Sequence, residues 1–596
     1  MNGNQSSDPK RMIVAVGLST AIILGWSLLF PQKKPPKHPA PAVASASAST
    51  GASAGASSAP GSTANGPAAP SAASGATGVH DAPVAPAGDA FAHFTEQTAA
   101  LEAPGQQRVS ISNRDGQVAA WDLLEAQYAM DDPAGFHLVV PPAAEVPHGV
   151  FLPPMVDLTV AGQPLVGVYQ VSAAGDAVTA HLDDAARGIT VDRIYTRGEA
   201  VHSLNVTVTV SNRGPSEVSY GLSARLRGAQ NNVEASGKFG AQSTMVFEGL
   251  CARAEKTVRE GAAGIVKKRA SAEDLPRFTD GLRYGAVDTK YFITALMPGV
   301  EGLSACELFT GTEAAGIDSA VAAQNTTYVT AKLDLPGGTV ASGKSVTRSF
   351  QLFGGPKKLE ILTAQTPSLG DSVDYGMWSP LCLPMLATLR WFYGIVPNFG
   401  VAIVLLTLLV KLLTFPLTQK QYKSMAAMRA IQPQLKALQE KYKEDRVRLQ
   451  SEMMALYKAN GVNPLAGCLP VLMMMPVYIS LYRTIGQAVE LYHAELGLWI
   501  HDLSAQDPYY ILPIVLGGLF VFQTRLNPPA GDPVQQKLMT WFMPIFFTAM
   551  MLFLPAGLVV YILCNTMLGI VQQSYMNKRV APPTPPNAPA AARGRS

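Results

Sequence analysis

The segment "TLLVKLLTFPLT" (Thr407–Thr418) is apolar apart from its threonines and a single cation, Lys411. It lies in the run Phe399–Leu417, which is close to the ~20 residues that an α-helix needs to cross a bilayer core. A lysine near the centre of such a helix costs about 2.5–3.5 kcal/mol on insertion scales. The segment therefore predicts a transmembrane helix in which something must compensate the charge of Lys411.

The composition favours a chain that lies partly in lipid. Apolar residues make up 48% of its 596 residues and charged residues only 15%, fewer than in an average soluble domain. The net charge of +3 is too small to indicate nucleic-acid recognition. We expect membrane lipid to be a partner and nucleic acid not to be one.

Further apolar runs predict further spans. Met12–Phe30 follows Lys10 and Arg11, and we favour an uncleaved signal anchor there over a cleaved signal peptide, because no A-x-A site follows it directly. The other candidates are clustered near the C-terminus: Pro464–Gly486, Tyr509–Arg525, Leu538–Leu554 and Ala556–Tyr575. With Phe399–Leu417, the chain has six predicted transmembrane helices.

Charged residues in the connections predict the orientation of these helices. The 419–461 connection carries nine Lys and Arg residues, whereas 487–508 carries four acidic residues and no Lys or Arg. Basic loops stay in the cytoplasm. This rule puts 1–11 and the Pro/Ala-rich tail 578–596 inside, and residues from 31 to about 378 outside.

The outer region divides by composition. Residues 31–90 are rich in Ala, Ser, Pro and Gly and predict a flexible linker. Residues 91–356 contain short alternating runs such as "LNVTVTV" (Leu204–Val210) between turn residues, which predict a large all-β sandwich domain. Residues 357–398 are expected to form an amphipathic helical segment at the outer face, before the membrane core 399–577.

The predicted outer domain contains a nucleotide-binding pattern and a pair of cysteines. Gly338–Ser345 matches the P-loop pattern, but the alternating run "VTRSFQLF" follows where a helix is required, so we exclude nucleotide binding. Cys251 and Cys306 share this domain, and an oxidising compartment would allow a disulfide between them. Sequence alone does not place the two residues within reach. No cysteine spacing indicates a metal site.

The basic connection predicts a helical hairpin. Gln419–Lys443 and Asp445–Ala459 are rich in good helix formers, Pro433 is expected to kink the first helix, and Gly461 to end the second. Two interpretations stay open: a solvated coiled coil, or a docking surface for a ribosome, a nascent chain or anionic lipid. The candidate docking residues are Lys420, Lys423, Arg429, Lys436, Lys441, Arg446 and Arg448.

Lys411 is expected in the cytoplasmic half of its helix. It lies twelve residues after Phe399, or ~18 Å along a helix axis. It either snorkels to the inner interface or faces a wet cavity, and we favour the cavity. Polar side chains that could line such a cavity are Thr407, Gln523, Tyr561 and Asn565.

An enzyme is not expected. The five clustered spans contain no His, Asp or Glu, so a catalytic or metal site lacks its groups. A Ser–Lys dyad fails because Ser480 and Ser574 lie at other depths than Lys411. We expect no cofactor. A small-molecule or lipid transporter, or a flippase, using the same cavity remains the alternative function.

The C-terminal region resembles the YidC membrane protein insertases. The similarity rests on "FPLTQKQYKSMAAMRAIQPQLKALQEKY", "EMMALYKANGVNPLAGCLPVLMMMPVYISLY", "LWIHDLSAQDPYYILP" and "MPIFFTAMMLFLPAGLVVYILCN", with "KYFITALMP" (Lys290–Pro298) in the outer domain. The resemblance implies an insertase and chaperone for inner-membrane proteins. It also implies a five-helix core with a hydrophilic groove open to the cytoplasm, and an outer domain in the periplasm.

The resemblance also assigns roles to residues and partners. Lys411 takes the place of the family's groove arginine, Met474 stands where glutamine is expected, and Tyr561 matches a substrate-contacting aromatic residue. We expect a substrate helix to slide along the lipid-facing side against Met473, Met474 and Tyr561. The expected partners are nascent inner-membrane proteins, the Sec translocon and ribosomes, with the protein in the bacterial inner membrane.

Overall fold

The structure is a computed structural model that describes residues 94–129, 135–141, 149–232, 246–270, 277–317, 325–442, 445–460, 469–526 and 538–579. All of them belong to one compact unit, Pro83–Ser596. The expected signal anchor at 12–30, the linker at 31–90 and the tail from residue 580 onward lie outside the described residues.

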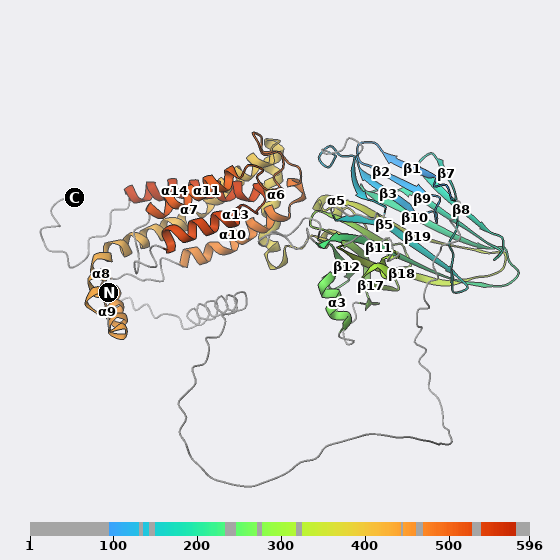
Figure 1. The fold of residues 1–596 in the computed structure, drawn as a ribbon, viewed down its shortest axis with the longest axis horizontal. Helices are drawn as coiled ribbons and strands as arrows, with labels where there is room; N and C mark the ends of the chain where they lie inside the picture. The colour runs from blue at the N-terminus through green and yellow to red at the C-terminus, as the bar shows by residue number, and fades with distance from the viewer. Residues whose placement is uncertain are drawn as a thin grey trace, which may run out of the picture. The chain divides into compact units, whose positions relative to one another are not determined.

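The N-terminal part of the described chain is a two-sheet β-sandwich (Figure 1). The larger sheet has the order β1-β2-β3-β4-β5-β11-β18-β17-β14, with β6 paired to β5. Its strands are β1 (Thr98–Ala103), β2 (Gln107–Ser112), β3 (Val118–Leu123), β4 (Phe136–Val139), β5 (Val150–Val160), β6 (Gln163–Pro164), β11 (Val218–Asn231), β14 (Arg277–Phe278), β17 (Ala305–Thr310) and β18 (Thr326–Val340).

The second sheet has the order β13-β12-β15-β16-β19-β10-β9-β8-β7. Its strands are β7 (Gln170–Ala174), β8 (Ala177–Asp184), β9 (Ile189–Arg197), β10 (Ser203–Asn212), β12 (Glu248–Arg253), β13 (Thr257–Gly261), β15 (Leu282–Asp288), β16 (Phe292–Pro298) and β19 (Ser345–Pro356). These strands pair antiparallel throughout. The prediction of a large all-β sandwich is confirmed.

Strand β10 shows why the alternating sequence forms this fold. Val206 and Val208 are buried between the sheets, whereas Thr207 and Thr209 lie on the other face. There the Thr207 hydroxyl bonds Ser349 and the Thr209 hydroxyl bonds Thr347, both on β19. A period of two thus supplies one apolar face and one polar face, as a half-buried strand requires.

The P-loop pattern falls in a β-hairpin. Gly338 and its neighbours end β18, and β19 begins at Ser345 without an intervening helix. Gly343 in the turn has φ +69°, which glycine adopts readily. The alternating strand predicted after the motif is therefore confirmed, and the motif is not followed by the helix N-terminus with which a P-loop binds phosphate.

A disulfide joins the two sheets. Cys251 on β12 and Cys306 on β17 are bonded, with 5.9 Å between their Cα atoms. The two strands belong to different sheets, so the bond crosses the sandwich core. The two cysteines are thus close in space although they are 55 residues apart in sequence.

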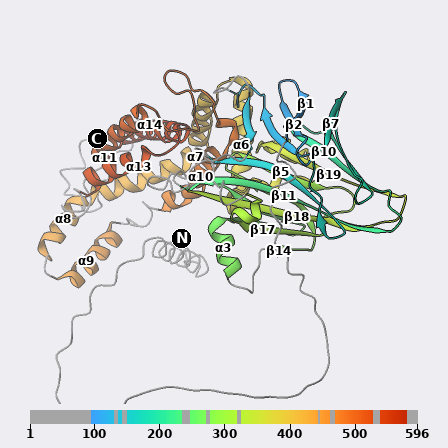
Figure 2. The ribbon, with the colours of Figure 1, turned by 45° about the vertical axis from the view of Figure 1, so that its right-hand side comes forward.

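Helices make up most of the C-terminal part, where α7, α10, α11, α13 and α14 run side by side (Figures 1 and 2). The helices of the sandwich and its connection are α3 (Ala262–Ala270), α4 (Thr312–Ala315), α5 (Leu359–Thr363), η1 (Gly370–Ser372), η2 (Gly376–Trp378) and α6 (Ser379–Ile395). Those that follow are α7 (Phe399–Ala430), α8 (Gln432–Lys441), α9 (Arg446–Ala459), α10 (Leu469–Gln487), η4 (Val489–Leu491), α11 (Ile511–Leu526), the π-helical η5 (Leu538–Phe542), α13 (Met543–Met551) and α14 (Ala556–Arg579).

Each of the five clustered apolar runs contains a helix, but their lengths differ. Within the described residues two helical segments are long and apolar enough to cross a membrane, Phe399–Gln419 and Ala556–Met576. Ile511–Thr524 and Thr540–Met551 are shorter apolar helices. A count of six transmembrane helices is therefore not established by helix length and stays a prediction.

The helical hairpin begins as an extension of the predicted span. α7 continues without a break to Ala430, and α8 starts at Gln432 with Pro433 in its first turn. Pro433 thus starts a new helix and does not bend an existing one, because a proline in the first turn gives up no helical hydrogen bond. Asp445 caps α9 by accepting a hydrogen bond from the Arg448 backbone N–H.

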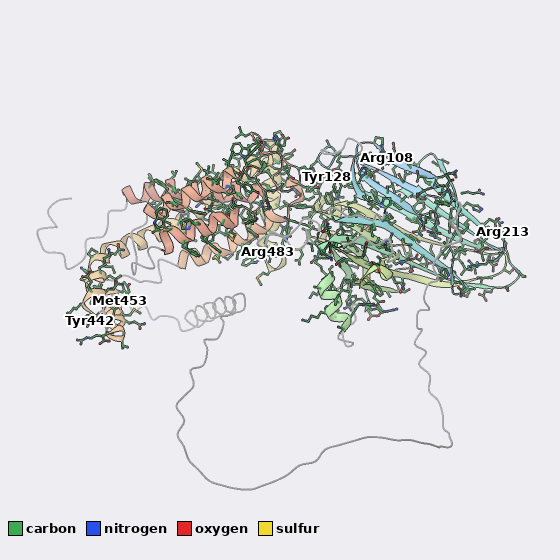
Figure 3. The ribbon with its side chains drawn as sticks, in the orientation of Figure 1. Arg108, Tyr128, Arg213, Tyr442, Met453 and Arg483 are labelled. Atoms are coloured by element: carbon green, nitrogen blue, oxygen red, sulfur yellow. A yellow bond between two sulfur atoms is a disulfide. The ribbon has the colours of Figure 1, made fainter. Side chains whose placement is uncertain are left out.

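Of the candidate docking residues, Lys436, Lys441 and Arg448 are exposed. Lys441 and Arg448 both contact the ring of Tyr442, which is labelled in Figure 3. The side chains of Lys420, Lys423, Arg429 and Arg446 lie outside the described part of the structure.

Candidate functional site

A polar stripe runs along α7 through Thr407, Lys411, Thr414 and Thr418, at the spacing of one helix face. The Thr407 hydroxyl donates to the Ile403 carbonyl at 2.7 Å, and Thr414 bonds its own helix in the same way. The hydroxyl groups of these two threonines therefore donate to carbonyl oxygens of their own helix. Lys411 is the member of the stripe that carries donors toward the neighbouring helices.

A second stripe on α14 faces it, with the polar residues Tyr561, Asn565 and Gln572 and, on the same face, Gly569. α7 and α14 pack against each other along their length. Near the C-terminal end of the stripe, the Gln572 amide donates to the Thr418 hydroxyl at 2.5 Å. Closer to the start of α14, the side chain of Asn565 interacts with that of Tyr478 on α10. The two stripes thus hold polar groups between apolar helices.

Lys411 and Gln523 meet at Gly569. A Cβ atom placed on Gly569 would lie 3.7 Å from the Lys411 ammonium nitrogen and 3.8 Å from the Gln523 amide nitrogen. The three residues come from α7, α11 and α14. The described residues of α7, α10, α11, α13 and α14 include no Asp or Glu. Two hydrogen-bond donors therefore converge where the described helices offer no carboxylate.

The structure corrects one expectation about the substrate path. Met474 and Tyr561 are each only 4% exposed, and Tyr561 belongs to the core shared by α6, α7, α10, α11 and α14. Neither side chain therefore presents a surface to lipid. The exposed methionines nearby are Met475 (46%) and Met567 (51%). The side chain of Met473 lies outside the described residues.

The connection between α10 and α11 is held by the β domain. The Gln127 amide lies within 2.9–3.4 Å of the carbonyl oxygens of Val489, Glu490 and Tyr492. The Tyr492 ring packs against Phe292 with the ring centroids 5.2 Å apart. Tyr128, labelled in Figure 3, also contacts this ring. These contacts join residues more than 190 positions apart in the chain, so no local sequence signal indicates them.

Charged side chains reinforce this connection. Arg390 on α6 forms an ion pair with Glu490 and a second one with Glu360 at 3.1 Å. Arg483, near the end of α10 and labelled in Figure 3, donates to the Tyr375 carbonyl at 3.4 Å. The sequence analysis did not single out either arginine, although a basic residue near the end of an apolar run is a signal for such an anchor.

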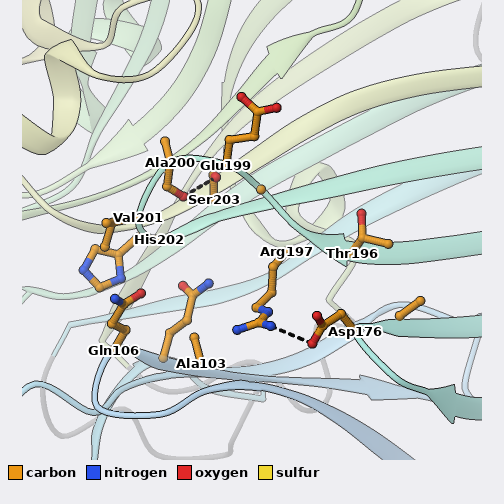
Figure 4. A pocket seen from close by; sticks show the side chains of 13 residues that line it. Ala103, Gln106, Asp176, Thr196, Arg197, Glu199, Ala200, Val201, His202 and Ser203 are labelled. Carbon is orange, nitrogen blue, oxygen red and sulfur yellow. Dashed lines mark hydrogen bonds and ion pairs between the residues drawn. The ribbon is translucent and has the colours of Figure 1, made fainter.

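A separate pocket of about 550 Å³ lies in the β domain (Figure 4). The turn Gly198–Ser203 forms one side, and an Arg197–Asp176 ion pair of 2.6 Å lies across it. His202 in this turn is buried and its Nε2 atom lies 3.0 Å from a Glu125 oxygen. The described residues contain no His, Cys, Asp and Glu cluster able to hold a metal ion. The pocket therefore adds no support for metal chemistry.

Family models cover nearly all of the described chain. The model described as "60Kd inner membrane protein" matches residues 391–583, and that described as "YidC periplasmic domain" matches residues 106–388. The boundary between them falls within α6. The two matches follow the division between the helical part and the β-sandwich.

Similar proteins carry the same family name. A "Membrane protein insertase YidC" of Citrifermentans bemidjiense is 34% identical over 70% of this chain and 73% of its own length. One of Syntrophus aciditrophicus is 40% identical over 53% of this chain, and the match spans 56% of that relative. The crystal structure of YidC from Thermotoga maritima has 15% identity and a TM-score of 0.30, covering 80% of this chain and 97% of that chain. The chain belongs to the YidC family of membrane protein insertases.

Proposed function

We propose that this chain inserts proteins into the bacterial inner membrane through a hydrophilic groove between α7, α10, α11 and α14, with no cofactor and no chemical step. The observation that carries the proposal is the convergence of the Lys411 and Gln523 nitrogens at Gly569, where the described residues of α7, α10, α11, α13 and α14 include no Asp or Glu. An ammonium group without a counter-charge is costly in lipid unless water or a passing anion compensates it.

The mechanism is physical. The polar outer segment of a substrate enters the groove from the cytoplasm and is solvated part of the way across the membrane, which thins the barrier. Lys411 attracts acidic residues of that segment transiently. The apolar helix of the substrate moves along the exposed side of α10 and α14, past Met475 and Met567. Methionine suits varied substrates because its side chain repacks easily. Transfer of ~20 apolar residues into lipid then drives release.

The proposed topology has six spans with both termini in the cytoplasm and the β domain in the periplasm. The distribution of Lys and Arg between the connections supports this orientation. The Cys251–Cys306 disulfide supports it independently, since such bonds persist in the periplasm and are rare in the cytosol.

The hairpin of α8 and α9 is proposed as the cytoplasmic docking surface for ribosomes or nascent chains. Its exposed basic residues Lys436, Lys441 and Arg448 support this role, because phosphate backbones and acidic segments attract such a surface. The Sec translocon is proposed as a second partner for substrates with large outer domains. Lipid contacts follow from the apolar surfaces of the helices.

Reconstitution tests the function directly. The full-length protein is purified, placed in lipid vesicles without other factors, and given a small inner-membrane protein with an acidic translocated segment. Insertion is measured by protease protection of that segment. We expect protection above that of protein-free vesicles. Vesicles that move a lipid or solute probe but leave the substrate accessible would favour the transporter alternative.

A further inference from the structure

We propose that Gly569 is the specificity-determining position of the groove, because it leaves room for one substrate carboxylate to bind Lys411 and Gln523 together. The inference rests on the proposed insertase function and names the residues that let an acidic side chain reach the cation. It predicts that bulk at position 569 removes the preference for acidic translocated segments without abolishing insertion.

The geometry supports a shared site. Both nitrogens lie within 4 Å of one point, the position of a Cβ atom on Gly569. An ammonium group and a primary amide are both donors, and a carboxylate has two acceptor oxygens. A carboxylate between them therefore receives a charge-assisted bond from Lys411 and a second bond from Gln523. Gln523 thus supplies part of the directionality that a lysine, unlike an arginine, lacks by itself.

The size of the side chain at position 569 decides whether a carboxylate can reach both nitrogens. The contacts of 3.7 and 3.8 Å are ordinary van der Waals distances, so an alanine fits there. A larger side chain adds atoms beyond this Cβ position, which is already in van der Waals contact with both nitrogens, and so competes with a carboxylate for them. Gly569 is buried between helices, so the added atoms cannot turn outward freely.

A matched control exists on a neighbouring helix. Gly518 on α11 is exposed, and a Cβ atom added there meets nothing within 4 Å. Gly518→Leu therefore adds the same bulk to a membrane helix without touching the Lys411 site. Gly569→Ala is the conservative variant at the site itself.

The experiment compares two substrates that differ by one Asp→Asn change in the translocated segment. Each is inserted by the full-length wild type, Gly569→Ala, Gly569→Leu, Gln523→Leu and Gly518→Leu proteins in vesicles, at matched protein content. We expect Gly569→Leu and Gln523→Leu to slow insertion of the Asp substrate about ten-fold, as the loss of a charge-assisted hydrogen bond predicts. Gly569→Leu and Gln523→Leu should slow the Asn substrate far less than the Asp substrate, and Gly569→Ala should slow the Asp substrate less than Gly569→Leu does. Gly518→Leu, which lies away from the site, should match wild type with both substrates.

The results distinguish a failure of the inference from a failure of the proposed function on which it rests. Equal slowing of both substrates by Gly569→Leu would assign Gly569 a packing role and overturn the inference. Unchanged insertion of the Asp substrate by Gly569→Leu would overturn it as well. If wild type inserts neither substrate, the proposed function fails and the inference fails with it. Retained insertion of the Asn substrate also shows that Gly569→Leu is folded.

Discussion

Cys251 on β12 and Cys306 on β17 form a disulfide that joins the two sheets of the β-sandwich. Both cysteines are fully buried, and the bond closes a loop across 55 residues of sequence. A cross-link of that length stabilises a domain mainly by restricting its unfolded chain. The two sheets are therefore held together by packing and by one covalent bond in the described structure.

Removal of this bond should lower the stability of the β domain. We expect the double variant Cys251→Ala/Cys306→Ala to lose about 3–4 kcal/mol of unfolding free energy, as a loop of this length predicts. Thermal unfolding of the full-length protein in detergent, followed by the β-sheet signal, measures the change. A reducing agent should destabilise wild type and leave the double variant unaffected. Equal melting of the oxidised wild type and the variant would contradict the prediction.

The charge of Lys411 should matter more than its shape. In cells depleted of their own insertase, wild type and Lys411→Arg should restore insertion of a substrate with an acidic outer segment, whereas Lys411→Ala and Lys411→Glu should not. The reason is that arginine keeps the positive potential, alanine removes it and glutamate reverses it. Protease accessibility of the segment is the measurement. Rescue by all four proteins at equal expression would exclude an electrostatic role and leave Lys411 as a snorkelling residue.

A buried ion network should hold the end of the β domain to the connection before α6. Asp288 is fully buried and accepts hydrogen bonds from Arg259 and Lys357, and Arg259 also donates to the Ser372 carbonyl. Asp288→Asn leaves the partly buried Arg259 and Lys357 with one fewer charge partner. We expect a loss of about 3–5 kcal/mol in unfolding free energy, as for a broken buried ion pair.

The matched control for Asp288 is Asp183, whose side chain is 52% exposed and pairs with the 62% exposed Arg213. Asp183→Asn should change the unfolding free energy by about 0–1 kcal/mol, because surface pairs are well screened. Chemical denaturation of both variants measures the difference. A similar small effect at both positions would show that the buried network does not stabilise the domain.

The unfolding free energy of the β domain should rise at alkaline pH, because the buried Lys290 loses its charge there. Burial lowers the pKa of Lys290 to about 8 from an ordinary 10.5. Between these two values the unfolded chain holds a proton that the folded domain has released, so the unfolding free energy rises with pH in this window. Below pH 8 the cost of keeping the buried ammonium charged is present in full.

The test compares wild type with Lys290→Met at pH 7 and pH 10. The variant should be more stable than wild type at pH 7, and its advantage should shrink at pH 10. Other titrating groups are shared and cancel in the difference. A stability difference that does not change with pH would show that Lys290 has an ordinary pKa in the folded domain.

The two parts of the fold could be predicted from the sequence to different extents. Alternation in Leu204–Val210 predicted a strand because burial of every second residue is a local property. The run around Lys411 predicted a helix in lipid, because length and hydropathy are also local. Five helices were found where apolar runs predicted them. Their lengths left the number of spans open, since the run before Pro555 is split between a π-helical segment and the short α13.

The candidate site was predictable only as a set of residues. Lys411, Thr407, Gln523 and Asn565 could be named from their polarity within apolar runs. The place where they come together could not be predicted, because Lys411 on α7 and Gln523 on α11 approach Gly569 on α14, and a glycine carries no polar signal. The expectation that Met474 and Tyr561 face lipid was wrong. Helix period alone does not fix which face of a helix meets a neighbouring helix.

By itself the sequence determined the division into a β domain and apolar helices, the polar residues within those helices, and the family. These follow from composition, period and motifs, which are properties of short segments. Only the tertiary structure decided that the disulfide crosses two sheets, that the α10–α11 connection packs on the β domain, and that Lys411 and Gln523 converge on Gly569. Such contacts depend on the packing of distant segments, which no local pattern specifies.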